Sequence, residues 1–331
     1  MIPISLIAGG LAQSNQIEIW HIGLAAFLSG SIWALDMPVR RPLMGEIVGE
    51  ARLGTAMGLD ALSYNASHML GPVAGGALLS VLGLGGAYFL SAGFYAMAVV
   101  AMVLLKHKDS VSQSNRRGLL REFAEGFVYL RVNRPMASIM GVTVVFNLWA
   151  YPMITMVPVI GKDILRLDAF SVGLLASVEG VGALIGTLAV ALWARTVDFM
   201  RLFSLGTFLY IVAVILFGWS SWVGISAVVL IVAGLGAAAF GVMQSALVLL
   251  NAPLALRGHM MGVLTVCIGL GPIGFLHIGW LADWIGAAEA LMLVGVEGLL
   301  GFALCWWLWP ELKSDQRVHS SAESSPDGTV P

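Results

Sequence analysis

Three carboxylates lie well away from both ends of long apolar runs of the sequence, at Asp60, Glu179 and Glu297. A charged side chain at the centre of a membrane helix costs about 2.5–3.5 kcal/mol on insertion scales, so each of these residues is a functional hypothesis. A carboxylate in a poorly solvated cavity can bind and release a proton near neutral pH. A histidine such as His68 titrates in that range without help. We therefore predict Asp60 or Glu179 as the proton carrier, with His68 and Glu297 as further candidates.

Asp60 has polar neighbours at helical spacing. Tyr64, Ser67, His68 and Gly71 fall within about 80° of it on a helical wheel, so they form a stripe that leads to Gly71 and Pro72. The alternative for Asp60 is an aspartate that caps a helix or pairs with an arginine at the inner membrane surface. His277, also in an apolar run, is interpreted as a buried histidine whose hydrogen bonds are satisfied.

The elements that position these residues must be membrane helices. Of the 331 residues, 59% are hydrophobic and 11% are charged, whereas soluble proteins are nearer half apolar and a quarter charged. A spanning helix needs about 20 mostly apolar residues. The apolar runs are 1–12, 19–38, 54–81, 85–105, 136–160, 170–194, 199–219, 222–250, 258–283 and 286–309. The first run is too short to span, and both cysteines, Cys267 and Cys305, are interpreted as buried thiols.

The distribution of basic residues gives the orientation. If Met1 starts in the cytoplasm, every Lys and Arg except Lys162 and Arg166 lies on the inner side, as the positive-inside rule requires. We predict a multi-pass protein of a bacterial inner membrane with both termini in the cytoplasm. The segment 313–331 is rich in Ser, Asp and Glu and is expected to be a disordered tail.

The only long polar connection is 106–135. Within it, Leu119, Phe123, Phe127 and Leu130 recur at helical spacing among charged residues. This pattern predicts an amphipathic helix at 116–131 on the inner membrane surface. A solvated linker with a few apolar residues is the alternative.

The chain repeats itself at an offset of about 200 residues. Gly54–Gly58 resembles Gly258–Gly262, Leu70–Pro72 resembles Leu270–Pro272, and Gly76–Gly83 resembles Gly279–Gly286. Subtracting this offset from the later runs leaves those at 136 and 170 without a counterpart. The repeat therefore predicts six plus six helices, of which about two are absent from the N-terminal half.

Three stretches carry a family resemblance: Met37–Met44 with Glu46–Val48, His68–Gly76, and Leu120–Arg131. Together with two related halves, they resemble the major facilitator superfamily, in its branch of enterobactin exporters and macrolide efflux proteins. His68–Gly76 matches the antiporter motif G-P-x-x-G-G, so Gly71, Pro72, Gly75 and Gly76 are expected to act in gating. Small residues four apart, here Gly71 and Gly75, allow close helix packing; plain packing is the alternative, and is preferred for Gly182 and Gly186.

The resemblance implies an all-α, polytopic membrane protein with a two-bundle fold, N-terminally truncated to about 10 of 12 helices. The expected parts are an incomplete bundle (1–105), a linker (106–135), a six-helix bundle (136–312) and the tail. The family's Gly-x-Leu-Ala-Asp-Arg motif is not found in its usual loop. Asn147, Trp149 and Tyr151 with Pro152 are expected to interrupt the first helix of the second half. The predicted substrate-pocket residues are Tyr64, Asn65, Asn147, Trp149, Tyr151 and Gln244.

The expected function is secondary transport by alternating access, with proton-coupled export of small amphipathic molecules such as drugs or siderophores. An uptake symporter and a non-transporting membrane protein are the alternatives. The sequence holds no H-E-x-x-H, G-x-S-x-G or Walker A motif, so we expect neither an enzyme nor ATP-driven transport. The expected partners are the substrate, protons or another coupling ion, and the lipid bilayer. We expect no metal, no cofactor and, at a net charge of −2, no nucleic acid; a monomer is favoured.

Overall fold

The computed structural model describes residues 1–48, 50–104, 128–193, 198–253 and 256–313. Within these residues the side chains of 33–46, 48, 50–58, 61–62, 64–65 and 193 are not described. The predicted amphipathic helix at 116–131 and the predicted tail therefore lie largely outside the described residues. The side chains of Tyr64 and Asn65 lie outside them too.

The described part of the chain contains helices and turns and no strand, which confirms the all-α prediction. Seven helical segments in it are long and apolar enough to cross a membrane: Ala66–Leu104, Arg134–Asp163, Ala169–Leu192, Phe199–Trp219, Val223–Asn251, Arg257–Ile285 and Ala287–Leu308. Two predicted runs, 54–81 and 85–105, form the single element α3 (Glu50–Leu104). That element is broken at Gly83, whose φ of 67° and ψ of −178° are not helical. Glycine suits this position because a Cβ disfavours positive φ.

The chain divides into two compact units. Unit 1 comprises Met1–Asn115 and Gly161–Gly180, and so contains α1 (Ile2–Gln13), α2 (Ile19–Val48), α3 and the first part of α7 (Ala169–Trp193). The start of α7 thus packs with the N-terminal helices, although the sequence placed it in the second bundle. Inside unit 1, α1 packs against α3 after the Gly83 break, where a Cβ at Gly9 would meet the Phe89 ring at 3.1 Å.

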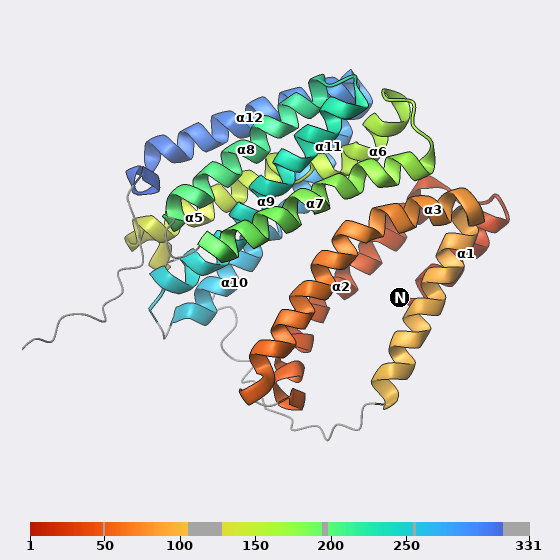
Figure 1. The fold of residues 1–331 in the computed structure, drawn as a ribbon, viewed down its shortest axis with the longest axis horizontal. Coiled ribbons are helices and arrows are strands. Elements are labelled where there is room, and N and C mark those ends of the chain that lie inside the picture. The colour runs from red at the N-terminus through yellow and green to blue at the C-terminus, as the bar shows by residue number, and fades with distance from the viewer. Residues whose placement is uncertain (49, 105–127, 194–197, 254–255, 314–331) are drawn as a thin grey trace, which may run out of the picture. The chain divides into compact units, whose positions relative to one another are not determined.

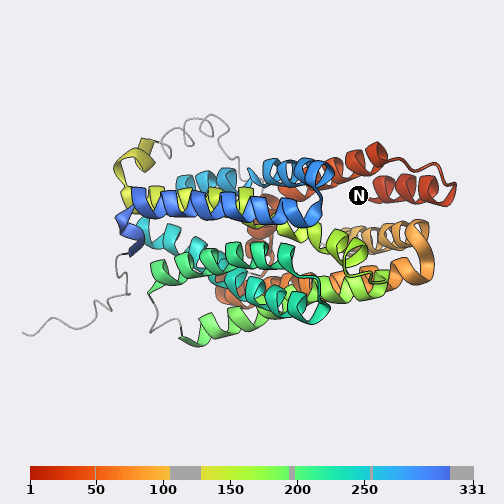
Figure 2. The ribbon, with the colours of Figure 1, turned by 90° about the horizontal axis from the view of Figure 1, so that it is seen from above.

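Unit 2 comprises Arg116–Ile160 and Val181–Pro331. Its elements are α5 (Arg134–Val145), the π-helical turn η1 (Phe146–Ala150), α6 (Met153–Asp163) up to Ile160, the rest of α7, α8 (Phe199–Trp219), α9 (Val223–Asn251), α10 (Arg257–Ile268), α11 (Gly271–Ile285), α12 (Ala287–Leu308) and η3 (Pro310–Lys313). Helix α8 packs against both α9 and α12 (Figures 1 and 2).

Aromatic and small residues build the core of unit 2. The Phe146 and Phe240 rings stack with centroids 3.8 Å apart, and Tyr210 packs on Phe146 at 4.9 Å. Helices α8 and α9 approach at Gly206 and Gly236, where a Cβ on either glycine would lie 2.7 Å from the carbonyl oxygen of the other. Small residues are the usual means by which membrane helices come this close.

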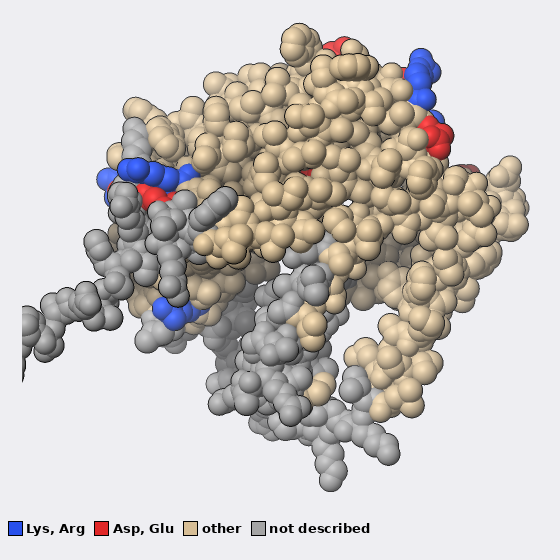
Figure 3. Space-filling view, viewed as in Figure 1, with Lys and Arg blue, Asp and Glu red and all other residues tan. Residues whose placement is uncertain are grey.

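The outer surface of unit 2 is apolar. Leu276, Trp284 and Trp307 are each about three-quarters exposed, which would be costly in water over so wide an area. On the face drawn in Figure 3, most of the Lys, Arg, Asp and Glu side chains show near the edges of the view, and the broad surface between them is almost entirely tan. A wide surface with few charged side chains suits contact with a lipid bilayer.

Asp198 begins α8 as a helix cap. Its carboxylate accepts hydrogen bonds from the backbone N–H groups of Met200 and Arg201, at 3.0 and 3.3 Å, and pairs with the Arg201 side chain at 3.1 Å. We expect Asp198→Ala to lower the free energy of unfolding by about 1 kcal/mol, the usual value of an N-cap. Arg201→Ala should cost less than half of that, because the Arg201 side chain is 59% exposed and solvent screens its charge. Thermal unfolding of both variants in detergent tests this, and equal losses would contradict it.

Asp168 lies just before α7 and accepts a hydrogen bond from the Phe170 backbone N–H at 3.2 Å. A hydrogen bond from the Ser171 side chain lowers the pKa of the Asp168 carboxyl. A lowered folded-state pKa means that this contact stabilises the fold above the ordinary carboxyl pKa of about 3.9. That contribution is lost as the pH falls through the folded-state value.

Candidate functional site

Three helical elements of unit 2 meet at the carboxylate of Glu297. The indole N–H of Trp149, in η1, donates a hydrogen bond to Glu297 Oε2 at 3.0 Å. The same oxygen lies 2.8 Å from Nε2 of His277, in α11. About a third of the Glu297 and His277 side chains is exposed, 32% and 34%. The structure therefore pairs Glu297, a predicted proton carrier on α12, with His277, which the sequence pattern had suggested is buried.

Glycines bring these three elements together. A Cβ on Gly274 of α11 would collide with the Leu148 carbonyl oxygen of η1, and a Cβ on Gly298 of α12 would lie 3.0 Å from the Trp149 Cβ. Neither glycine can take a side chain without moving a neighbour. Both glycines therefore hold α11 and α12 close enough to η1 for Trp149 to reach Glu297.

The π-helical turn η1 interrupts the first long helix of unit 2, as predicted from Asn147, Trp149, Tyr151 and Pro152. Tyr151 N–H bonds to the Phe146 carbonyl at 2.9 Å, the wider i→i+5 spacing of a π-turn. Such turns are frequent at functional sites. The Tyr151 ring follows the turn and lies 5.9 Å from that of Phe275.

Two predicted pocket residues share a buried polar partner. Asn147 donates from Nδ2 to the Thr143 carbonyl at 2.9 Å, and Gln244 of α9 donates from Nε2 to the Thr143 hydroxyl at 2.9 Å. All three residues are buried, with Thr143 fully so. We call Thr143, Asn147 and Gln244 the polar row. Sequence reasoning missed Thr143, because a lone threonine in an apolar helix ordinarily bonds only to its own backbone.

We expect Thr143→Val to lower the free energy of unfolding by about 1–3 kcal/mol, because it leaves the Gln244 amide without its hydroxyl partner in a buried place. Thr265→Val is the matched control: its hydroxyl also bonds to the backbone one turn earlier, at 2.9 Å, but it is exposed. Thermal unfolding in detergent compares the two. Equal effects would show that the polar row adds nothing to stability.

The antiporter-like motif lies in unit 1, where α3 packs against the first part of α7. A Cβ on Gly76 would lie 2.5 Å from the Ala169 carbonyl oxygen, and a Cβ on Gly173 would collide with the Pro72 carbonyl oxygen. Gly71 and Gly75 have no described atom within 4 Å of where a Cβ would be. The close approach that the sequence assigned to Gly71 and Gly75 is therefore made by Gly76 instead.

Ser177 of α7 completes this contact. Its hydroxyl accepts a hydrogen bond from the Val73 backbone N–H at 3.1 Å, next to Pro72, which has no N–H of its own. By contrast, Gly182 and Gly186 pack on α9, against Ile231 and Ala238. The preferred packing interpretation of that glycine pair is confirmed.

The other predicted proton carriers also lie in unit 1. Glu179 is buried, with 3% of its surface exposed, and Asp60 and His68 are half-buried. Helices α3 and α7 touch at Met69 and Gly180, where a Cβ on the glycine would lie 2.7 Å from the Met69 Cα. These two residues are the sequence neighbours of His68 and Glu179, so each carrier stands next in sequence to a residue of the α3–α7 contact.

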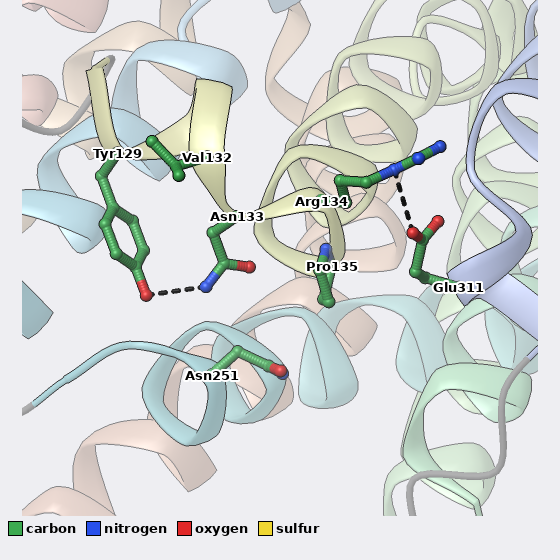
Figure 4. Close-up of a pocket in the computed structure, with 7 residues that line it drawn as sticks. All are labelled: Tyr129, Val132, Asn133, Arg134, Pro135, Asn251 and Glu311. Carbon is green, nitrogen blue, oxygen red and sulfur yellow. Dashed lines mark hydrogen bonds and ion pairs between the residues drawn. The ribbon is translucent and has the colours of Figure 1, made fainter.

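An open pocket of about 550 Å³ lies at one end of unit 2 (Figure 4). Asn133 and Tyr129 point toward each other in it and are joined by a 2.7 Å hydrogen bond, while Arg134 pairs with Glu311 at 3.0 Å. Its lining includes none of the residues predicted for the substrate pocket. Asn133 is occupied as the cap of α5, accepting from the Met136 N–H at 3.0 Å. The pocket thus lies where α5, α9 and η3 meet.

Comparison with known proteins decides the family. The family model of the Major Facilitator Superfamily matches residues 1–275 and 155–331, which together cover the whole chain. The chain belongs to this superfamily. A member of this superfamily is a secondary transporter rather than an enzyme, and the apolar helices agree with a multi-pass membrane protein. No curated protein matches the sequence.

Two solved structures show the same superfamily fold. One is a POT family transporter in complex with 5-aminolevulinic acid, with a TM-score of 0.66. The other is a POT family transporter in complex with a thioalcohol conjugated peptide, with a TM-score of 0.70. Each is 14% identical to this chain, and each alignment covers 95% of this chain and 81% of the solved one. At this identity the likeness concerns the fold alone, and the enterobactin and macrolide branch stays a prediction.

Proposed function

We propose that the chain is a proton-coupled exporter of small amphipathic molecules, such as drugs or siderophores, in a bacterial inner membrane. The observation that carries the proposal is the burial of Glu179 within an apolar helix. A buried carboxylate in such a helix is costly when charged, so its presence there points to a function. Binding and releasing a proton is a function that requires such a group. Asp60, His68 and Glu297 are the further proton carriers in this proposal.

The polar row and the motif have separate roles in the proposal. In unit 2, Asn147 and Gln244 contact the substrate, with Trp149 and Tyr151 from the π-turn region that holds Asn147. Tyr64 and Asn65 of α3 are the further substrate residues of this proposal. Gly71, Pro72, Gly75 and Gly76 act in gating, because the α3–α7 contact leaves no room for a side chain at Gly76. Both termini lie in the cytoplasm, on the side with most Lys and Arg.

The experiment is ethidium movement in proteoliposomes that contain the purified full chain, with an acidic lumen and the membrane potential clamped to zero. Ethidium carries a permanent positive charge, so an acidic lumen does not trap it as it would a weak base. Antiport predicts accumulation of ethidium in the acidic lumen, whatever the orientation of the protein. Movement out of the acidic lumen would instead favour an uptake symporter. No movement above that of protein-free vesicles would contradict export of amphipathic cations.

A further inference from the structure

We propose that Glu297 and His277 form a second proton-binding site, in unit 2, and that Trp149 is a positioning residue that links this site to η1. This inference rests on the proposed proton coupling and names a site for it outside the α3–α7 contact. It starts from one atom, Glu297 Oε2, at which side chains from η1, α11 and α12 meet. No role for His277 follows from the family or from the sequence pattern.

The hydrogen bonds define where a proton can go. An indole N–H is a donor only, so Glu297 Oε2 must accept from Trp149. Before the proton binds, the Glu297 carboxylate accepts a second hydrogen bond from Nε2–H of a neutral His277. The pair then carries one negative charge. A proton that binds His277 Nδ1 drives the Nε2 proton across the 2.8 Å contact to Oε2. The loaded pair is then a neutral carboxyl and a neutral imidazole, with one proton gained and no other bond changed.

The surroundings of Glu297 favour this neutral loaded state. The residue lies about 15 Å along α12 from Ala287 at 1.5 Å per residue, near the middle of a hydrocarbon core of about 30 Å. An ion pair there must pay the desolvation of both partners, whereas a neutral pair need not. The net charge of the pair at this depth thus changes from −1 to 0 when the proton binds.

His277 is the one ionisable partner at this level among the described elements in contact with α12. On α12 itself Glu289 lies in the first turn and Cys305 two turns beyond Glu297, and Asp283 lies near the Gly286 turn that ends α11. Tyr210 of α8 is fully buried against Phe146. The remaining ionisable side chains of these elements stand in end turns: Arg134 of α5, Arg201 of α8, and Glu311 and Lys313 of η3.

Trp149 links proton binding at Glu297 to the position of η1. Hydrogen bonds to an ionised acceptor are about twice as strong as those between neutral groups. Loading Glu297 therefore weakens the bond that ties Trp149, and with it η1, to α12. Asn147 of the same π-turn belongs to the polar row. Proton binding at Glu297 and the position of the polar row are coupled through this one turn.

The test is infrared difference spectroscopy of the purified full chain in detergent between about pH 8 and pH 5. We expect a protonated-carboxyl band that is lost in Glu297→Gln. In Trp149→Phe the band should shift in frequency, because the carboxyl has lost a hydrogen-bond donor. In His277→Asn the band should shift in frequency as well, because the carboxyl has exchanged its imidazole partner for an amide. Glu289→Gln, on the exposed first turn of the same helix, should leave the spectrum unchanged.

A Glu297→Gln spectrum identical to that of the native chain overturns the site. Loss of the band in Glu297→Gln with an unshifted band in His277→Asn overturns the pair. If Glu297→Gln is not recovered folded, the band frequencies of Trp149→Phe and His277→Asn decide in the same way. The measurement needs no substrate, so it separates this inference from the proposed export. A chain that fails to move ethidium can still show the Glu297 band, and a chain that moves ethidium without that band refutes this site and leaves the proposed export standing.

Discussion

Gly173→Val is expected to lower the free energy of unfolding by about 3 kcal/mol or more and to reduce the yield of folded chain. The new side chain would meet backbone atoms: its Cβ would collide with the Pro72 carbonyl oxygen and lie 3.2 Å from the Gly76 Cα. Backbone atoms within a helix cannot rotate away, so the cost lies at or above the usual range for overpacking. Thermal unfolding and size-exclusion chromatography in detergent measure both effects.

Gly75→Val is the matched control. It makes the same change in the same motif at a position where no described atom lies within 4 Å of the new Cβ. We expect it to change the free energy of unfolding by less than about 1 kcal/mol, since glycine is itself a poor helix former. If both variants lose the same stability, the sensitive feature is glycine at these positions in general. The packing of α3 against α7 would then not be responsible.

Periodicity and composition predicted the helices well because lipid imposes one rule on the whole chain. A spanning segment must satisfy its backbone internally and present apolar side chains outward, so each span is visible as a run. The interruption near Asn147 and the break at Gly83 were also predictable, from polar and glycine residues between apolar runs. The form of the interruption, a π-turn, was not, because the extra residue in the turn depends on packing with α11 and α12.

Pairings between helices were beyond sequence reasoning. Glu297 and His277 lie on neighbouring helices joined by the Gly286 turn, yet their 2.8 Å contact depends on helix rotation. The motif pattern named four residues without showing that Gly76 packs and that Gly71 and Gly75 do not. Ser177 and Thr143 carry no signal in an apolar run, since hydroxyls are common there and bond to their own helix. These contacts depend on the surface of a second helix, which the sequence of a single apolar run does not encode.

Glu179→Gln is expected to abolish proton-driven ethidium accumulation, with a loss of at least about tenfold, and to leave ethidium exchange without a pH gradient largely intact. Glutamine keeps the size and hydrogen-bonding oxygen of a protonated glutamate but cannot release a proton. A tenfold loss corresponds to about 1.4 kcal/mol. Placing a charge at this depth costs about 2.5–3.5 kcal/mol, so removing the ionisable group can account for a loss of this size. The measurement compares accumulation and exchange in the same proteoliposomes.

Asp163→Asn is the control, because it removes an exposed carboxylate at the end of α6 and should leave both activities unchanged. Asp60→Asn tests the half-buried carboxylate of α3 in the same assay and, if Asp60 only caps or pairs at the membrane surface, should behave like the control. Retained accumulation in Glu179→Gln would show that its burial serves structure. The coupling would then have to come from Asp60, from His68 or from the Glu297–His277 pair. Loss of accumulation with retained exchange places the coupling proton at Glu179, because only a site that must ionise during the cycle separates the two activities.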